Sequence, residues 1–168
     1  MKRLIYILIP LAFVSLSAFI VDNETTNYLF KIERSKDNNQ IFYTVNTDAA
    51  GKLKEKPITV FWIKNTKKGR VEPLTWIQKK YAYGLSYKHC CEDCATFQFV
   101  SYDKLNFLLK KEEKEYKVYT KKENKILEVQ RIFVQIDGGT FWLPNVTEIK
   151  LYAQELKSGK EIVETIIP

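Results

Sequence analysis

Residues 28–45, which read YLFKIERSKDNNQIFYTV, decide the fold. Apolar side chains take every second position in two runs, at Tyr28, Phe30 and Ile32 and again at Ile41, Tyr43 and Val45. A period of two is typical of a strand with one buried face. The polar cluster Ser35–Asn39 separates the runs and has the composition of a hairpin turn. The sequence therefore predicts an antiparallel hairpin here.

Further short apolar runs follow the hairpin at strand-like spacing. Residues 58–63 (ITVFWI) are apolar on both faces, as expected of a central strand covered on two sides. Other strands are predicted around residues 97–99, 105–109, 116–118, 125–136, 147–154 and 162–166. Because no long helical patterns alternate with them, a doubly wound parallel sheet is excluded. We expect one all-β domain over residues 27–168, an antiparallel β-sandwich or partly open barrel of about eight to ten strands with one short helix.

The short helix is predicted near residues 75–83. Thr75 and Gln78 have the spacing of a capping box, in which each side chain satisfies a backbone N–H of the first turn. Gly84 can adopt the left-handed conformation that ends a helix. A helix of about two turns is too short to be stable alone, so we expect packing against the sheet to hold it.

The N-terminal segment has the pattern of an export signal. Lys2 and Arg3 precede an apolar stretch from Leu4 to Val21, and small residues favour cleavage after Ser17 or Ala18. We therefore expect a signal peptide over residues 1–18 and a periplasmic or secreted mature protein without a stable membrane span. The alternative is a retained anchor, because the apolar stretch is close to the roughly 17–25 residues that span a bilayer.

Charge and composition exclude several functional classes. The 27 lysines and arginines exceed the 20 acidic residues only mildly, and the two kinds interleave, as in Lys110–Glu115. A nucleic-acid binder would concentrate positive charge on one face, so we expect no nucleic-acid partner. The single histidine excludes zinc proteases that need two, and the chain lacks phosphate-binding glycine loops and a Gly-x-Ser-x-Gly elbow. These absences disfavour an enzyme.

The segment His89–Cys94 contains all three cysteines and the histidine. If residues 87–91 form a strand, His89 and Cys91 share a face and Cys94 returns from a turn, which makes these three candidate ligands for Zn or Cu. One alternative is a disulfide, most simply Cys91–Cys94, because exported thiols are readily oxidised. Redox chemistry and the absence of any role are further alternatives. Redox chemistry is disfavoured because the flanks are strand-like rather than a helix N-terminus.

Aromatic side chains suggest a second candidate site. Trp76, Tyr81 and Tyr83 lie in or beside the predicted helix, and rings at the mouth of a β-fold can stack on sugars or apolar ligands. The alternative is that the tryptophans Trp62, Trp76 and Trp142 belong to the core.

These observations favour a non-enzymatic envelope module that binds or interacts with an envelope protein, a glycan or an apolar ligand, with no resident cofactor. The rival hypothesis is a metal- or redox-active envelope protein that uses the His89–Cys94 hairpin.

A family pattern is carried by Leu29–Lys36, Pro57–Ile63, Glu72–Gln78, Tyr81–Gly84, Thr147–Ile149 and Gly159–Val163. Together these segments resemble a family of exported bacterial envelope proteins, common among Bacteroidetes and described as domain of unknown function 4833. The resemblance covers nearly the whole mature chain and implies an exported bacterial protein. It implies no activity, cofactor or site residue. The His89–Cys94 hairpin is not part of the pattern, which disfavours it as the family's main function.

Overall fold

The structure is a computed structural model that describes residues 28–140 and 144–168. The predicted signal peptide and Trp142 lie outside the described residues. Within those residues, no helix has the length and hydropathy needed to cross a bilayer.

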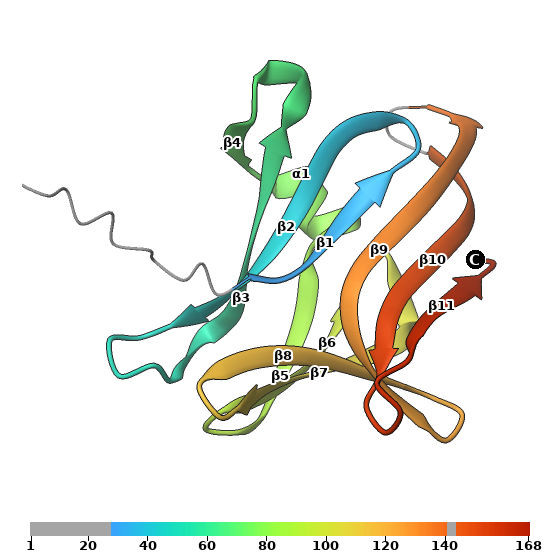
Figure 1. The fold of residues 1–168 in the computed structure, drawn as a ribbon. Helices are drawn as coiled ribbons and strands as arrows, with labels where there is room; N and C mark the ends of the chain where they lie inside the picture. The colour runs from blue at the N-terminus through green and yellow to red at the C-terminus, as the bar shows by residue number, and fades with distance from the viewer. Residues whose placement is uncertain (1–27, 141–143) are drawn as a thin grey trace, which may run out of the picture.

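The described chain is built almost entirely from strands (Figure 1). The elements in chain order are β1 (Tyr28–Arg34), β2 (Asp37–Thr47), β3 (Leu53–Lys64), η1 (Asn65–Lys67), β4 (Arg70–Pro73), α1 (Trp76–Tyr81), β5 (Leu85–Cys91), β6 (Cys94–Phe99), β7 (Tyr102–Glu112), β8 (Glu115–Lys122), β9 (Lys125–Gly139), β10 (Pro144–Glu155) and β11 (Glu161–Ile166). The prediction of an all-β fold with one short helix is confirmed.

All eleven described strands belong to one sheet that curls into a half-barrel. The order is β4-β3-β2-β1-β9-β8-β7-β6-β5, with β10 beside β9 and β11 beside β10. Neighbouring strands run antiparallel except for β1 and β9, which are parallel, so the sheet is mixed. The strand number exceeds the predicted one because β4 and β5 have mostly exposed side chains, and an apolar alternation is present only at Leu85 and Tyr87 of β5.

Strand β9 joins two branches of the sheet. It pairs with β8 over Lys125–Glu128 and with β1 over Arg131–Val134. Both pairings use one edge of β9, because β10 occupies the other edge along Leu127–Gly139. The branch β1–β4 and the branch β5–β8 therefore start from the same edge and curl toward each other.

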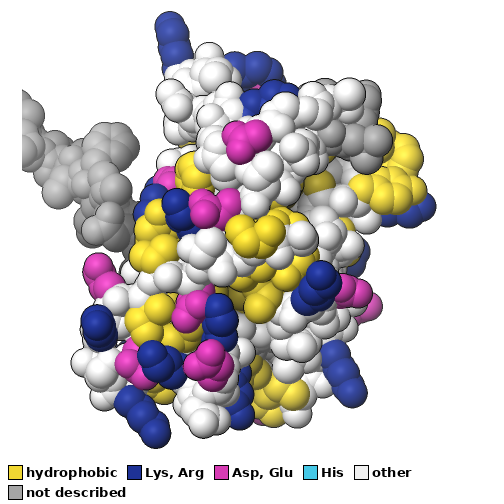
Figure 2. Space-filling view, turned by 90° about the vertical axis from the view of Figure 1, so that its right-hand side faces the viewer, with side chains coloured by type: hydrophobic (Ala, Val, Ile, Leu, Met, Phe, Trp, Pro, Cys, Tyr) yellow, Lys and Arg dark blue, Asp and Glu magenta, His cyan; other side chains and the backbone are white. Residues whose placement is uncertain are grey.

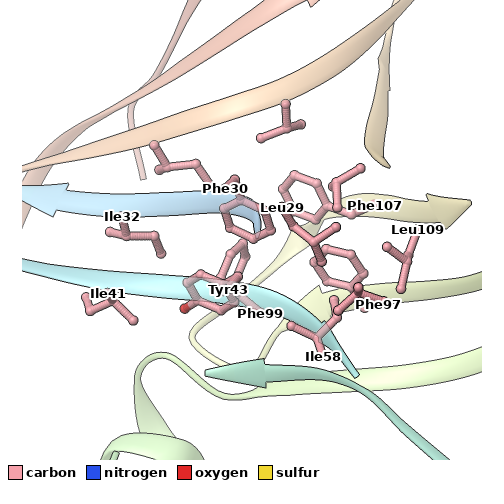
Figure 3. Close-up of a cluster of buried hydrophobic side chains, with 14 of the residues drawn as sticks. Leu29, Phe30, Ile32, Ile41, Tyr43, Ile58, Phe97, Phe99, Phe107 and Leu109 are labelled. Atoms are coloured by element: carbon pink, nitrogen blue, oxygen red, sulfur yellow. The ribbon is translucent and has the colours of Figure 1, made fainter. Parts of the chain in front are cut away.

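The core fills the space between these branches (Figure 3). Phe30 of β1 is fully buried and stacks on Tyr43 of β2, with ring centroids 4.4 Å apart. Its ring also lies parallel to that of Phe97 in β6, at 6.3 Å, and Phe97 stacks on Phe107 of β7 at 5.1 Å. Aromatic rings thus connect the two branches across the core.

The predicted hairpin is confirmed as β1 and β2, with a tighter turn than expected. Strand β2 already begins at Asp37, whose carboxylate accepts hydrogen bonds from the Asn39 amide at 3.0 Å and from Arg34 at 2.5 Å. The buried Asn39 side chain accepts hydrogen bonds from the backbone and hydroxyl of Thr66. Long-range partners therefore allow polar residues of the predicted turn to join the strand.

The capping box of α1 is confirmed, whereas the predicted role of Gly84 is wrong. The helix ends at the Ala82 cap, and Gly84 does not have a left-handed φ. A Cβ at Gly84 would lie 1.7 Å from the carbonyl oxygen of Lys79. Glycine is therefore needed here because the chain passes close to the helix backbone.

Candidate functional site

A cavity of about 550 Å³ lies on the concave side of the half-barrel. Its wall combines β1, the end of α1, the turn between β6 and β7, and strands β9 and β10. Most of the lining side chains are aliphatic or aromatic, including Ile32, Phe99, Leu105, Phe107, Ile132, Val134, Val146, Ile149, Leu151 and Ile166. Figure 2 shows apolar side chains gathered in the middle of one face, with charged side chains around them.

The polar side chains of the cavity come from turns, strand ends and α1 rather than from the middles of strands. Arg34, Lys36 and Asp37 lie at the turn between β1 and β2, and Ser101 lies between β6 and β7. Tyr83 follows α1. Buried strand residues such as Leu151 supply the apolar part of the wall. The cavity is therefore amphipathic, with its charged groups at one hairpin.

Arg34 is the most constrained charged side chain of this site. Its Nη1 donates to the Tyr83 hydroxyl at 2.9 Å, and its Nη2 forms a salt bridge with Asp37 at 2.5 Å. The guanidinium carbon lies 4.8 Å from the ring centre of Trp62, where the aromatic quadrupole attracts a cation. The side chain is only 16% exposed, so these contacts fix a largely desolvated positive charge in the cavity wall.

The segment that carries Tyr83 is held by hydrogen bonds from two branches of the sheet. The Tyr43 hydroxyl donates to the Tyr83 carbonyl at 3.0 Å, and the Ser101 hydroxyl donates to the Ala82 carbonyl at 2.6 Å. The Val100 amide donates to the Gly84 carbonyl at 3.0 Å. Burial raises the pKa of Tyr43 well above its ordinary value, so this hydroxyl remains a donor. The wall around Tyr83 is thus rigidly positioned.

Gln78 fastens α1 to the sheet. Its side-chain oxygen accepts from the Thr75 amide at 3.0 Å, which completes the capping box, and also from the Trp62 indole at 3.3 Å. Trp62 is buried in β3, and its ring meets that of Tyr83 edge-on at 5.4 Å. One amide thereby joins the helix start to the core beneath the cavity wall.

Two of the three predicted ligand-binding aromatics line the cavity. Tyr81 is 60% exposed at its edge, and Tyr83 is half-buried within the wall. Trp76 is 68% exposed and does not line the cavity. The alternative that the tryptophans are core holds for Trp62 and not for Trp76. Ligand binding by these residues stays a prediction.

Sequence reasoning did not single out Arg34, Asp37 or the aliphatic wall. Arg34 and Tyr83 are 49 positions apart, and no local pattern links them. The available signal was an arginine directly before the turn of a hairpin whose strands are otherwise apolar on one face. An isolated charge at such a position also fits an exposed turn, so the tertiary fold was needed to assign it.

The cysteine hairpin differs from the prediction. The structure bonds Cys90 to Cys94, with their Cα atoms 5.5 Å apart, and leaves Cys91 as an exposed free thiol. This corrects the predicted Cys91–Cys94 disulfide. The register of β5 and β6 pairs His89 with Ala95 and Cys91 with Cys94, so Cys90 is an extra residue in a bulge. The bulge brings the Cys90 sulfur, rather than that of Cys91, into bonding position.

The predicted metal ligands His89, Cys91 and Cys94 are not brought together. Among the described residues, the potential ligands that cluster are the sulfurs of Cys90, Cys91 and Cys94, within 4.8 Å of one another. The His89 ring instead places Nε2 3.1 Å from the Glu55 carbonyl oxygen. Because Cys94 is engaged in a disulfide, it offers no thiolate in this state.

We expect one reactive thiol in the oxidised protein, at Cys91. Alkylation without reductant should label Cys91, because this side chain is exposed whereas the other two sulfurs are bonded. Digestion after Glu92 separates Cys94 from the other cysteines, so mass spectrometry should find Cys94 linked to the peptide that carries labelled Cys91. A label on Cys90 instead would contradict the pairing.

The family model for domain of unknown function 4833 matches residues 30–165, which includes nearly every described strand. The chain belongs to the DUF4833 family. The matched region contains Arg34, Tyr83 and most of the cavity lining, so in this DUF4833 chain the cavity is formed within the family domain. No curated protein and no solved structure matches the chain significantly.

Proposed function

We propose that this DUF4833 chain is an exported, non-enzymatic binding module that holds an apolar small molecule in its half-barrel. The observation that carries the proposal is the cavity of about 550 Å³ with its mostly apolar wall. Small-molecule sites in proteins are typically about 300–1,000 Å³, apolar, and fitted with a few positioned polar groups. Export is inferred from the N-terminal pattern of Lys2, Arg3 and the apolar stretch that follows.

The chemistry of the wall favours an apolar ligand over a glycan. Ile132, Ile149 and Leu151 offer no hydrogen-bonding side-chain groups to sugar hydroxyls, and a buried hydroxyl without a partner is unfavourable. An aliphatic ligand would instead gain about 25 cal/mol for each Å² of apolar surface removed from water. Binding would be driven mainly by this burial, while the polar hairpin would orient the ligand.

The proposal predicts that the full-length mature protein binds N-phenyl-1-naphthylamine, a neutral dye that fluoresces in apolar surroundings. Replacing Ile149 with phenylalanine should weaken dye binding about tenfold or more, because the larger ring occupies cavity volume. The matched control is Ile126→Phe, since Ile126 is exposed on β9 and does not line the cavity. Fluorescence titration measures both variants.

Unchanged unfolding midpoints for the two variants would show that the comparison reports on the cavity. Dye binding that is absent in the unsubstituted protein would refute the proposal. Equal weakening by Ile149→Phe and Ile126→Phe would place the dye elsewhere on the protein and would also refute it.

A further inference from the structure

We infer that the ligand of this cavity is a single-chain amphiphile whose anionic headgroup is held by Arg34. The inference rests on the proposed function, which it deepens by naming the class of ligand. Three observations support it: the N–H donors of Arg34, the charged side chains near Arg34, and the position of these groups relative to the apolar wall.

The guanidinium of Arg34 retains unused donor capacity. An arginine has five N–H donors, and the structure pairs one on Nη1 with Tyr83 and one on Nη2 with Asp37. The Nε atom is buried and has no hydrogen-bond partner within the described residues. A buried donor without a partner costs about 1–3 kcal/mol. Because Nε is shielded from the cavity, a ligand oxygen would instead reach the second N–H groups of Nη1 and Nη2.

The charges that line the cavity favour an anion. Arg34 and Lys36 are cationic, and Asp37 is the single acidic side chain among the described lining residues. Once the Arg34–Asp37 pair is counted, Lys36 is the remaining charged side chain among the described lining residues. Arg34 also has little freedom to turn toward solvent, since Tyr83, Asp37 and the face of Trp62 hold it. The site is preorganised for an anionic oxygen.

The arrangement of the wall fixes the orientation of the ligand. Arg34 and Lys36 lie at the β1–β2 turn, whereas Phe107, Ile132 and Leu151 supply apolar surface from the strands. A headgroup at the hairpin would leave its hydrocarbon chain against that surface. A carboxylate and a phosphate monoester satisfy this geometry equally well, because arginine binds both through paired N–H donors.

The test uses palmitate, cetyl phosphate and cetyl alcohol, each below its critical micelle concentration, in displacement of N-phenyl-1-naphthylamine from the full-length mature protein. At least one of the anions should bind about tenfold or more tightly than the neutral alcohol, the effect of one charge-assisted hydrogen bond. The stronger of the two identifies the headgroup as a carboxylate or a phosphate. Arg34→Gln should remove this preference, so that neither anion binds the variant more tightly than cetyl alcohol binds it.

Arg131→Gln is the matched control. Arg131 also forms a salt bridge, with Glu33 at 2.7 Å, and lies 3.7 Å over the ring of Tyr152, yet it does not line the cavity. This variant should retain the preference for the anion. Asp37→Asn provides a test in the opposite direction, because removing the carboxylate that competes for Arg34 should strengthen anion binding. The side-chain oxygen of the new asparagine can still accept the hydrogen bond from the Asn39 backbone amide.

The outcomes separate the inference from the proposed function. Binding of dye and alcohol without a preference for either anion would overturn the inference and leave the apolar cavity in place. A preference that survives Arg34→Gln would also overturn the assignment to Arg34. Absence of binding by the dye and all three probes would refute the proposed function itself.

Discussion

Replacing Gly84 with alanine is expected to destabilise the protein by about 3 kcal/mol or more, the upper range for inserting an atom into a closely packed site. The added Cβ would lie 1.7 Å from the carbonyl oxygen of Lys79, and that oxygen belongs to the backbone of α1. The helix end must move, which strains the hydrogen bond between Gly84 and Val100. Urea unfolding monitored by circular dichroism measures the loss.

Gly69→Ala is the control for this substitution. Gly69 has a φ of +77°, and a Cβ there would meet no atom within 4 Å, so its cost is the left-handed backbone alone. That cost is about 1–2 kcal/mol for an L-residue. A loss at Gly84 no larger than at Gly69 would show that the close approach to Lys79 is not limiting. Gly84→Ala should also weaken dye binding, because Tyr83 directly precedes the displaced residue.

Replacing Phe30 with alanine is expected to cost about 3–5 kcal/mol, as for a large aromatic side chain removed from a core. Phe30 is fully buried and contacts the rings of Tyr43, Phe97 and Phe99. Phe30 belongs to one branch of the sheet and Phe97 to the other. The variant would therefore lose an aromatic contact between the two branches and leave an empty space there. The loss is again measured by urea unfolding.

Phe42→Ala is the matched control on the neighbouring strand. Phe42 lies between the buried Ile41 and Tyr43 in β2, so its ring lies on the opposite face, where it packs on Tyr28 and Phe61. It is partly exposed, and such aromatic pairs contribute about 0.5–1.5 kcal/mol beyond the area they bury. Equal losses for Phe30→Ala and Phe42→Ala would contradict the assignment of the core to the concave face.

Local signals predicted the elements whose structure is determined locally. The alternation through Phe30 and Tyr43 identified β1 and β2, and the Thr75–Gln78 spacing identified the start of α1. Hydrophobic period and capping chemistry act over a few residues, so one sequence suffices to recognise them.

Features that depend on distant partners could not be predicted in the same way. Strand β1 pairs in parallel with β9, whose other end pairs with β8, and strand period specifies neither the partner nor the direction of a strand. The cavity appears only when the sheet curls, and its key contact joins Arg34 to Tyr83. The Cys90–Cys94 bond required knowledge of the bulge, because a shift of one residue changes the face on which each thiol lies.

The parallel ladder between β1 and β9 also affects how quickly the chain can fold. Its salt bridge between Glu33 and Arg131 connects residues 98 positions apart, so the ladder forms only after a long loop has closed. The β1–β2 hairpin can form early from neighbouring residues, but the ring of Phe30 stays exposed to water until the second branch arrives. High contact order of this kind places folding in the range of roughly milliseconds to seconds. During that interval the exposed ring and the unpaired strand edges of the hairpin favour misassociation.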